Sequence, residues 1–344
     1  MKMSPEYVII GFMKVLLYLE AADQLSKSGI GRAIKHQQKA LEIAGIDYTT
    51  NPEDDYDLVH INTYGIKSWK LLKQAQKAGK RVIMHAHSTK EDFENSFIGS
   101  NLVAPLFKKH LMRFYQAADY LITPTDYSKQ LIQSYGITTP IVAISNGIDL
   151  SRYQQSDSKE AIFRAHFNLK KGDKVVISAG LFFERKGIDD FVKVAKLMPD
   201  VTFIWFGHIN HYLIPSHIRK IVEGEHPENV IFPGYIKGDI YEGAMTGADA
   251  FFFPSREETE GIVVLEALAS RQNLVLRDIP VYQGWIDERS AYLAKNVVGF
   301  AYALEKVMTG KEDKTEAGYQ VAASKDIKLV AEQLATVYQK VLEL

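Results

Sequence analysis

Two successive series of short apolar runs, separated within each series by amphipathic stretches, constrain the fold more than any other feature of this sequence. Strand candidates occupy residues 15–19, 58–62, 82–84, 120–123 and 141–144 in the first series, and 174–179, 201–206, 229–232, 250–253 and 273–276 in the second. Helical patterns such as 31–44 and 64–78 lie between them. This alternation is typical of parallel sheets covered by helices on both faces. The sequence therefore predicts an α/β chain of two facing Rossmann-like domains with a cleft between them.

A polar stretch between the two series divides the chain. Its 344 residues exceed one typical hydrophobic core, so two domains are expected. The expected units are residues 1–12 (an extension or tag remnant), 13–150 (first domain), 151–173 (linker), 174–325 (second domain) and 326–344 (a helix). Within the linker we expect only a short helical turn near 161–167. The last unit has apolar residues at helical spacing, which predicts a C-terminal helix that crosses back onto the first domain.

Composition excludes several classes of protein. The absence of cysteine excludes disulfides, thiolate metal sites and cysteine nucleophiles, and it fits a reducing cytoplasm. A formal net charge of -1 gives no global attraction to nucleic acid, so any electrostatic partner must meet a local patch. Glu6, Lys14 and Glu20 interrupt the N-terminal apolar run, which argues against a secretory signal. No apolar run reaches the length of a membrane span.

The stretch "PSREETEGIVVLEALAS", residues 254–270, joins a strand to a helix that starts near Gly261. The backbone N–H groups of Ile262 and Val263 would be free at the first helical turn and favour a phosphate there. Glu258 would lie on the loop beside them, where it could grip sugar hydroxyls. Glu266 sits among apolar residues, where a carboxylate without a partner is costly, so we expect it to accept hydrogen bonds from a ribose. The alternative is an ordinary acidic loop and an exposed Glu266.

This stretch resembles the E-x7-E signature of retaining glycosyltransferases of family four, which have the GT-B fold. Other segments resemble the family in the same order: "SGIGRAIKHQ" its glycine loop, "VIMHAHSTKEDF" its histidine loop, "TPTDYSKQLI" with "ISNGID" the end of its first domain, and "FPGYIKGDIYEGAMTGADAFFFPSR" the approach to the signature. The resemblance covers nearly the whole chain from Met13. It implies a retaining α-glycosyltransferase that binds a nucleotide-sugar in the second domain and an acceptor in the first.

The resemblance also assigns roles within the second domain. In "AGLFFERKGID" Lys186 matches the family's lysine on the donor diphosphate, whereas Leu181 stands where the family has an arginine. We expect Arg185 to supply that charge; the alternative is a solvated basic pair. The expected donor-binding residues are Gly31, Gly180, Lys186, Tyr235, Ile236, Glu258, Gly261, Ile262, Val263 and Glu266. With His87, the residues Arg185, Lys186 and Glu258 are the catalytic candidates, and the two cations would stabilise charge developing on the leaving diphosphate.

His87 follows a strand and matches the family's histidine, which contacts the transferred sugar near the reacting face. A structural histidine is the alternative, and His85 takes the role only if the register slips. The glycines Gly29 and Gly31 lack the third glycine of a dinucleotide fingerprint, since Ile34 occupies its place. We expect them to let the backbone approach the sugar-phosphate or the acceptor closely.

The sequence requires no metal and no cofactor besides the UDP-sugar co-substrate. "DDYD", residues 54–57, contains a D-x-D that binds metal in other glycosyltransferases. Here it precedes a strand of the first domain, far from the signature. We therefore interpret it as turn chemistry.

Basic and aromatic residues are concentrated in the first domain: residues 62–118 hold ten Lys/Arg against three Asp/Glu. "KSWKLLKQAQKAGKR" and "APLFKKHLMRFY" are helical patterns that predict docking on an anionic bilayer. The expected acceptor and membrane residues are Gly29, Trp69, Lys70, Lys73, Phe107, Lys108, Lys109 and Arg113, with Lys67, Lys77, Leu106, Leu111 and Met112 nearby. Solvated surface helices are the alternative, and nucleic acid is disfavoured because no binding motif accompanies the patch.

Within the family the chain resembles the Gram-positive glycolipid synthases that extend glucosyl-diacylglycerol. The resemblance implies transfer of galactose, or alternatively glucose, from a UDP-sugar to a glycolipid acceptor such as monoglucosyl-diacylglycerol. The protein would act as a peripheral protein on the cytoplasmic face of the membrane. Two rivals remain, namely a family-four enzyme acting on a soluble or cell-wall acceptor, and a GT-B-like sugar-nucleotide epimerase or binder.

Overall fold

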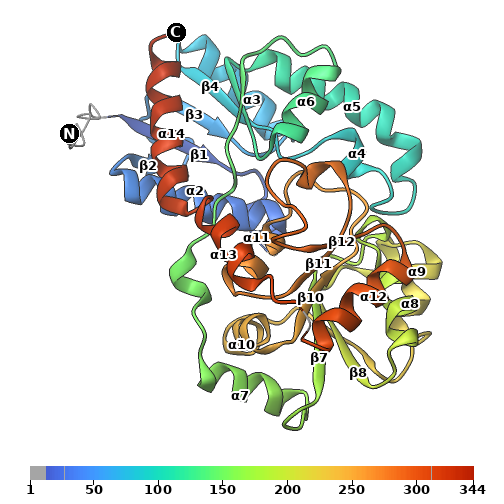
Figure 1. Ribbon diagram of the computed structural model, residues 1–344. Coiled ribbons are helices and arrows are strands. Elements are labelled where there is room, and N and C mark those ends of the chain that lie inside the picture. The colour runs from blue at the N-terminus through green and yellow to red at the C-terminus, as the bar shows by residue number, and fades with distance from the viewer. Residues whose placement is uncertain (1–12, 27, 311) are drawn as a thin grey trace, which may run out of the picture.

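A computed structural model describes residues 13–26, 28–310 and 312–344, which form two α/β domains (Figure 1). Each described domain contains one parallel six-stranded sheet with helices on both faces. The predicted fold, two facing Rossmann-like domains, is therefore confirmed. Residues 1–12, set apart as an extension, lie outside the described residues. Within those segments, no helix combines the length and the hydropathy needed to span a bilayer.

The first sheet is built from strands that are mostly buried. Its strands are β1 (Lys14–Tyr18), β2 (Asp47–Thr49), β3 (Leu58–Ile61), β4 (Arg81–His85), β5 (Tyr120–Thr123) and β6 (Ile141–Ala143). They pair in the order β2-β1-β3-β4-β5-β6. The helices of this part are α1 (Ala22–Leu25), α2 (Gly29–Ala44), α3 (Ile66–Lys77), α4 (Lys90–Phe93), α5 (Ser100–Ala117) and α6 (Asp126–Ser134).

The second sheet repeats this plan. Its strands are β7 (Lys174–Ala179), β8 (Val201–Phe206), β9 (Val230–Gly234), β10 (Ala250–Phe253), β11 (Leu274–Arg277) and β12 (Tyr292–Ala294). They pair in the order β12-β11-β10-β7-β8-β9. The remaining helices are η1 (Leu150–Tyr153), α7 (Asp157–His166), η2 (Glu184–Lys186), α8 (Ile188–Leu197), η3 (His211–Leu213), α9 (Ser216–Glu223), α10 (Asp239–Gly247), α11 (Ile262–Ala269), η4 (Pro280–Tyr282), α12 (Val297–Met308), α13 (Thr315–Ala323) and α14 (Ile327–Leu342).

The central strands of the second sheet are buried on both faces, which explains why they are continuously apolar. In β10 the side chains of Phe251 and Phe253 enter one hydrophobic cluster, and that of Phe252 enters the cluster on the opposite face. All three are fully buried. Because successive side chains of a strand point to opposite faces of the sheet, this run of three phenylalanines contributes to both hydrophobic clusters.

In both sheets the strand order reverses beside the first strand of the domain, β1 or β7. Open parallel sheets bind ligands beyond the carboxyl ends of their strands at such a reversal. In the second domain the reversal lies between β7 and β10. The loops that follow these two strands carry Arg185, Lys186 and Glu258, so the topology brings these side chains to one place.

The C-terminal helix α14 crosses back onto the first domain, as predicted (red in Figure 1). Its apolar residues, including Val330 and Leu334, share a hydrophobic cluster with residues of β1 and α2. The segment between the domains differs from the expected short turn. It forms the ten-residue helix α7, which Ser156 caps and which buries Phe163 in the core of the second domain. A single fully buried aromatic residue fixes this helix against the second domain.

Candidate functional site

A cavity of about 490 Å³ lies between the two domains. That volume is in the range of small-ligand sites. Its walls include these predicted residues: Gly29, His87 and Phe107 from the first domain, and Gly180, Arg185, Lys186, Tyr235, Ile236, Glu258, Gly261, Ile262 and Val263 from the second. Gly31 and Glu266 lie behind its wall, whereas Trp69, Lys70, Lys73, Lys108, Lys109 and Arg113 lie on α3 and α5 away from it.

The N-terminus of α11 forms part of the cavity wall. Gly261 precedes the helix in the left-handed region, with φ of 87°. The backbone N–H groups of Ile262 and Val263 donate to no group in the described part of the chain. Together with the helix dipole, these two donors make an anion site at the carboxyl end of β10.

Glu258 faces two cations from the loop after β7. The Lys186 ammonium binds Glu258 Oε1, and Arg185 Nη1 lies 3.6 Å from the same oxygen. Ser255 Oγ also donates to it, at 2.6 Å. Burial opposes ionisation of Glu258, but attraction to Lys186 and Arg185 holds its pKa below the ordinary value. Burial, and then repulsion by Arg185, lowers the pKa of Lys186.

Arg185 reaches across to the first domain. Its Nε donates to Ser96 Oγ at 2.9 Å, and its Nη2 lies 3.0 Å from Asp92 Oδ1. Nη1 also donates to the backbone oxygen of Glu257 at 2.8 Å. Burial raises the pKa of Asp92, although attraction to Arg185 opposes the rise. Arg185 therefore joins the two domains and also lines the cavity. Leu181 lines the same cavity with an apolar side chain.

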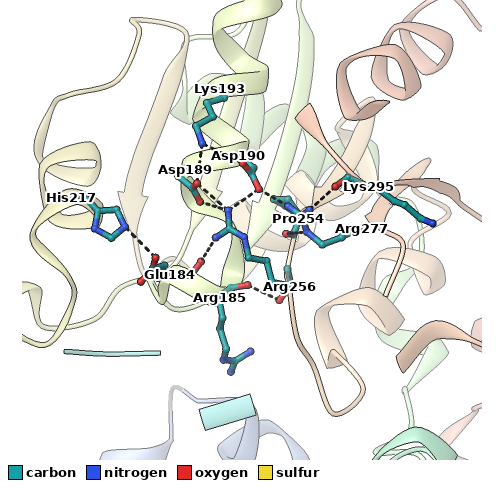
Figure 2. A network of polar contacts seen from close by, with 11 residues as sticks. Glu184, Arg185, Asp189, Asp190, Lys193, His217, Pro254, Arg256, Arg277 and Lys295 are labelled. Carbon is teal, nitrogen blue, oxygen red and sulfur yellow. Dashed lines mark hydrogen bonds and ion pairs between the residues drawn. The ribbon is translucent and has the colours of Figure 1, made fainter. Parts of the chain in front are cut away.

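A network of polar contacts joins the loop after β7 to the loop after β10 (Figure 2). Arg256, from the loop after β10, donates to the backbone oxygen of Glu184 at 2.8 Å and to Asp189 and Asp190 at 2.8 and 2.7 Å. Arg277 pairs with Asp190 as well. Because the two loops are pinned to each other, Lys186 and Glu258 keep a fixed relative position.

Glu266 is buried but not isolated. Arg32 Nη1 donates to both of its oxygens, at 3.0 and 2.9 Å, and the Tyr241 hydroxyl donates to Oε2 at 2.8 Å. Attraction to Glu266 raises the pKa of Arg32. Sequence reasoning missed Arg32 and Tyr241, although an arginine directly after the glycine loop was an available signal. The pairing accounts for a carboxylate within an otherwise apolar helix.

The loop after β10 carries two carboxylates besides Glu258, namely Glu257 and Glu260, and both contact the first domain. The Tyr127 hydroxyl donates to Glu257 at 2.9 Å. Glu260 is fully buried and accepts from Ser145 Oγ at 2.5 Å and from the backbone and side-chain nitrogens of Asn146 at 3.0 and 2.8 Å. Burial raises the pKa of Glu257 to about 7. The loop after β10 thus forms part of the interface between the two domains.

His87 lies in the wall of the cavity, and His85 does not. The His87 ring stacks on the His85 ring with centroids 4.0 Å apart. Its Nε2 lies 2.8 Å from Asn62 Oδ1. Burial lowers the pKa of His87 to about 3, so this side chain is neutral at physiological pH.

The two glycines of the glycine loop have different roles. A Cβ on Gly31 would lie 2.2 Å from the backbone oxygen of Leu25, so glycine permits α2 to pack against the preceding turn. Close packing against Leu25 is therefore sufficient to explain the glycine at position 31, and its predicted role beside a ligand stays a prediction. Gly29 lines the cavity, and no atom of the described residues lies within 4 Å of the position that its Cβ would take.

The basic helices have exposed and buried members. Lys70, Lys73, Lys109 and Arg113 are exposed on α3 and α5. Several expected apolar anchors are not fully exposed: Leu111 is buried, and Trp69, Phe107 and Met112 are half-buried. Among the expected cations, Lys108 is half-buried. Arg113 covers the Trp69 ring at 3.9 Å, and Lys108 covers the Tyr135 ring at 4.0 Å. Of the expected apolar anchors Leu106 is exposed, and Ile66, Ile98, Leu102 and Val103 reach solvent as well.

The aspartates of "DDYD" are hydrogen-bonded within the first domain. Asp54 accepts from Thr49 Oγ1 at 2.5 Å, and Asp57 accepts from the backbone nitrogen of Lys14 at 2.7 Å. Over the described segments, no group of three or more His, Asp or Glu side chains is arranged to hold a metal ion. These aspartates therefore stabilise local backbone structure.

Comparison with known proteins gives matches over nearly the whole chain. The family model "Glycosyltransferase Family 4" matches residues 44–152, and "Glycosyl transferases group 1" matches residues 159–323. The chain is 49% identical to the processive diacylglycerol alpha-glucosyltransferase of Acholeplasma laidlawii, over 96% of this chain and 99% of that protein. It is 25% identical to the alpha-galactosylglucosyldiacylglycerol synthase of Streptococcus pneumoniae, over 77% and 72% of the two chains.

Two solved structures have the same fold. The sucrose-phosphate synthase of Thermosynechococcus elongatus superposes with a TM-score of 0.79 at 16% identity, over 96% of this chain and 99% of that one. Anabaena HepE in complex with UDP-glucose superposes with a TM-score of 0.72 at 18% identity, over 95% and 100%. At these identities the likeness concerns the fold alone.

Proposed function

The chain belongs to glycosyltransferase family 4 and is a glycosyltransferase, and from this premise we propose that it moves a hexose from a UDP-sugar to a diacylglycerol-based acceptor with retention of anomeric configuration. The observation that carries the proposal is the 49% identity, over almost the full length of both chains, to a processive diacylglycerol alpha-glucosyltransferase. The relative named for galactosyl transfer is only 25% identical. We therefore propose glucose as the hexose, in place of the galactose that the sequence alone favoured.

The second domain supplies what a sugar-diphosphate donor needs. The free N–H groups at the start of α11 and the Lys186 ammonium surround one part of the cavity, and Glu258 lies beside them. As the bond from the anomeric carbon to the diphosphate oxygen breaks, negative charge develops on the diphosphate. Fixed donors and cations stabilise that charge more strongly in a buried site than in water. The acceptor oxygen then bonds to the same face of the anomeric carbon, and its proton passes to the leaving diphosphate.

The first domain offers a surface suited to an anionic bilayer. Along α5 the exposed residues Leu102, Leu106, Lys109 and Arg113 follow one another at spacings of four, three and four, so they share one face of the helix. Leu102 is 85% exposed and Leu106 is 67% exposed. An apolar stripe that continues into cations is the pattern of a helix lying in a membrane interface. Lys70 on the neighbouring α3 adds to the positive charge.

An apolar path leads from this stripe to the cavity. Phe107, the residue after Leu106, stacks on Phe93 with centroids 4.0 Å apart, and Phe97 packs on Phe93 at 5.0 Å. All three phenylalanines line the cavity. We propose that the acyl end of the acceptor remains against the stripe while its hydroxyl reaches the donor.

Product analysis tests the reaction. The purified protein is incubated with radiolabelled UDP-glucose or UDP-galactose and vesicles containing diacylglycerol or monoglucosyl-diacylglycerol, and the lipids are separated and identified by mass spectrometry. We expect hexosyl lipid from UDP-glucose and none from Lys186→Ala. Release of UDP without a glycolipid, or transfer only to a soluble sugar, would contradict the proposal and favour one of the two rivals.

Vesicle co-sedimentation tests the docking surface separately. Each cation near an anionic bilayer contributes about 1 kcal/mol, so Lys70→Glu with Lys109→Glu should release the protein from anionic vesicles. Raising the salt from 0.1 to 1 M shortens the Debye length from about 10 to about 3 Å and should have the same effect on the wild type. The matched control is Lys171→Glu with Lys328→Glu, two exposed lysines away from α5. Equal binding of all three proteins, insensitive to salt, would refute electrostatic docking.

A further inference from the structure

A chain of buried polar side chains connects the C-terminal helix α14 with His87 in the cavity. It runs through Tyr338 on α14, His60 on β3, His85 on β4, Gln37 on α2, and Asn62 after β3. Each of these five side chains is at most 3% exposed. Buried polar groups in such numbers are costly unless their hydrogen bonds are made, so the pattern of donors and acceptors is constrained.

The side-chain nitrogen of Gln37 fixes the direction of the whole chain. Nε2 donates to Asn62 Oδ1 at 2.8 Å and contacts His85 Nδ1 at 3.0 Å. With the Gln37 amide in this orientation its nitrogen only donates, so His85 Nδ1 accepts and His85 carries its proton on Nε2, which has no partner among the described groups. His60 Nε2, 3.2 Å from the same Nδ1, then has to donate. His60 Nδ1 in turn accepts from the Tyr338 hydroxyl at 2.8 Å.

The same logic extends to the site. With the Asn62 and Gln37 amides in this orientation, Asn62 Oδ1 accepts from Gln37 and cannot donate to the His87 Nε2 that lies 2.8 Å away, while Asn62 Nδ2 and Gln37 Oε1 have no partner among the described groups. His87 therefore carries its proton on Nε2. Its other nitrogen, Nδ1, bonds to none of the described groups, and the ring lies in the cavity wall.

We propose that Asn62 and Gln37 are positioning residues that hold His87 as the neutral Nε2–H tautomer, so that Nδ1 presents a lone pair to a hydroxyl of the transferred sugar. The hydroxyl part of this inference rests on the proposed function. The hydrogen bond at one ring nitrogen of a histidine decides what the other nitrogen can do. Stacking of the His87 ring on His85, with 12° between the planes, prevents the ring from turning away. Burial keeps all three histidines of the chain neutral.

Ring ¹⁵N chemical shifts test the tautomer without any substrate, so this result does not depend on the proposed function. In histidine-labelled wild-type protein, with the resonance assigned by loss in His87→Gln, we expect Nε2 protonated and Nδ1 unprotonated throughout pH 5–8. In Asn62→Leu the Nε2 partner is lost, and a mixture of tautomers is expected. A wild-type His87 protonated on Nδ1, or titrating in this range, would overturn the proposal.

A pH profile of kcat tests the consequence for transfer. Asn62→Asp keeps the shape but faces His87 Nε2–H with a carboxylate, which favours the imidazolium and raises its pKa by one or more units. We expect a loss of turnover at acidic pH that the wild type does not have. Asn62→Leu should reduce kcat roughly tenfold, the effect of one lost hydrogen bond, with unchanged affinity for UDP by calorimetry. The control is Tyr338→Phe, which alters only the far end of the chain and should leave the profile unchanged. If Asn62→Asp folds and ring ¹⁵N shifts show the same tautomer and the same pKa for His87 as in the wild type, Asn62 has no positioning role.

Discussion

Replacing Glu266 with Gln tests whether this carboxylate binds the donor's ribose or serves only to pair with Arg32. The substitution keeps the side-chain shape and removes the negative charge. Glu266 already accepts three hydrogen bonds, two from Arg32 and one from Tyr241, and a carboxylate offers about four such positions. A charge-assisted hydrogen bond contributes roughly 1.5–3 kcal/mol, so affinity for UDP should fall about tenfold to a hundredfold.

The same substitution leaves the Arg32 guanidinium facing a neutral amide. Removing one partner of a fully buried ion pair costs about 3–5 kcal/mol. The Arg32 side chain is 29% exposed, so solvent screens part of that cost and we expect about 1–2 kcal/mol. Adding Arg32→Met removes the unpaired cation. The double variant should therefore regain most of the lost stability while its affinity for UDP stays low.

Titration calorimetry with UDP and thermal unfolding of the four proteins in this cycle separate the two effects. If Glu266 binds ribose, UDP affinity depends on Glu266 whether or not Arg32 is present. If Glu266 only joins the domains, Arg32→Met alone weakens UDP binding as much as Glu266→Gln does, and the double variant is no worse. Unchanged UDP affinity in Glu266→Gln would remove this residue from the donor site.

Two further predictions concern the loops around the cavity. If Arg185 supplies the charge that Leu181 lacks, Arg185→Ala should lower kcat more than it raises the apparent KM for the acceptor. This is the expected signature of an interaction made mainly in the transition state. Wild-type kinetics for Arg185→Ala, together with an inactive Lys186→Ala, would exclude this role. For Glu257, burial raises the pKa from 4.5 to about 7, so between these values the folded protein binds more protons than the unfolded one and stability falls as pH rises. Glu257→Gln should flatten the dependence of the unfolding temperature on pH over this window, and an unchanged slope would show that another group causes it.

The strands were predictable because burial on both faces leaves a short continuous apolar run that few other elements produce. The strands β5, β7, β8 and β10 begin and end where the sequence predicted. The edge strands β2 and β12, of three residues each, were missed, whereas the equally short edge strand β6 was predicted from its continuous apolar run. Helix α7 was underestimated for a related reason. Its burial rests on Phe163, so its sequence lacks a long apolar stripe.

The site was predictable only as far as topology reaches. Loops after parallel strands meet at one edge of a sheet, which explains why Lys186, assigned from the family resemblance, lies beside Glu258. The pairing of Arg32 with Glu266 joins residues 234 positions apart and depends on how one domain sits on the other. Periodicity also did not separate the exposed from the buried apolar residues of α5. Both faces of that helix carry apolar residues, so the sequence alone could not tell the buried Leu111 from the exposed Leu102.

The two adjacent cations of the cavity respond differently to the separation of the domains. Lys186 pairs with Glu258 of its own domain, so that contact survives any opening of the cleft. Arg185 pairs with Asp92 of the other domain. If the cleft opened, Arg185 would lose this partner, and less negative charge would offset the repulsion between Arg185 and Lys186. A donor diphosphate bound next to Lys186, as proposed above, would supply that charge. Donor binding and the Arg185–Asp92 contact therefore act on the same positive charge. The effects of substituting Arg185, which contacts Asp92 directly, should thus depend on Asp92 more strongly than those of substituting Lys186, which Asp92 only attracts.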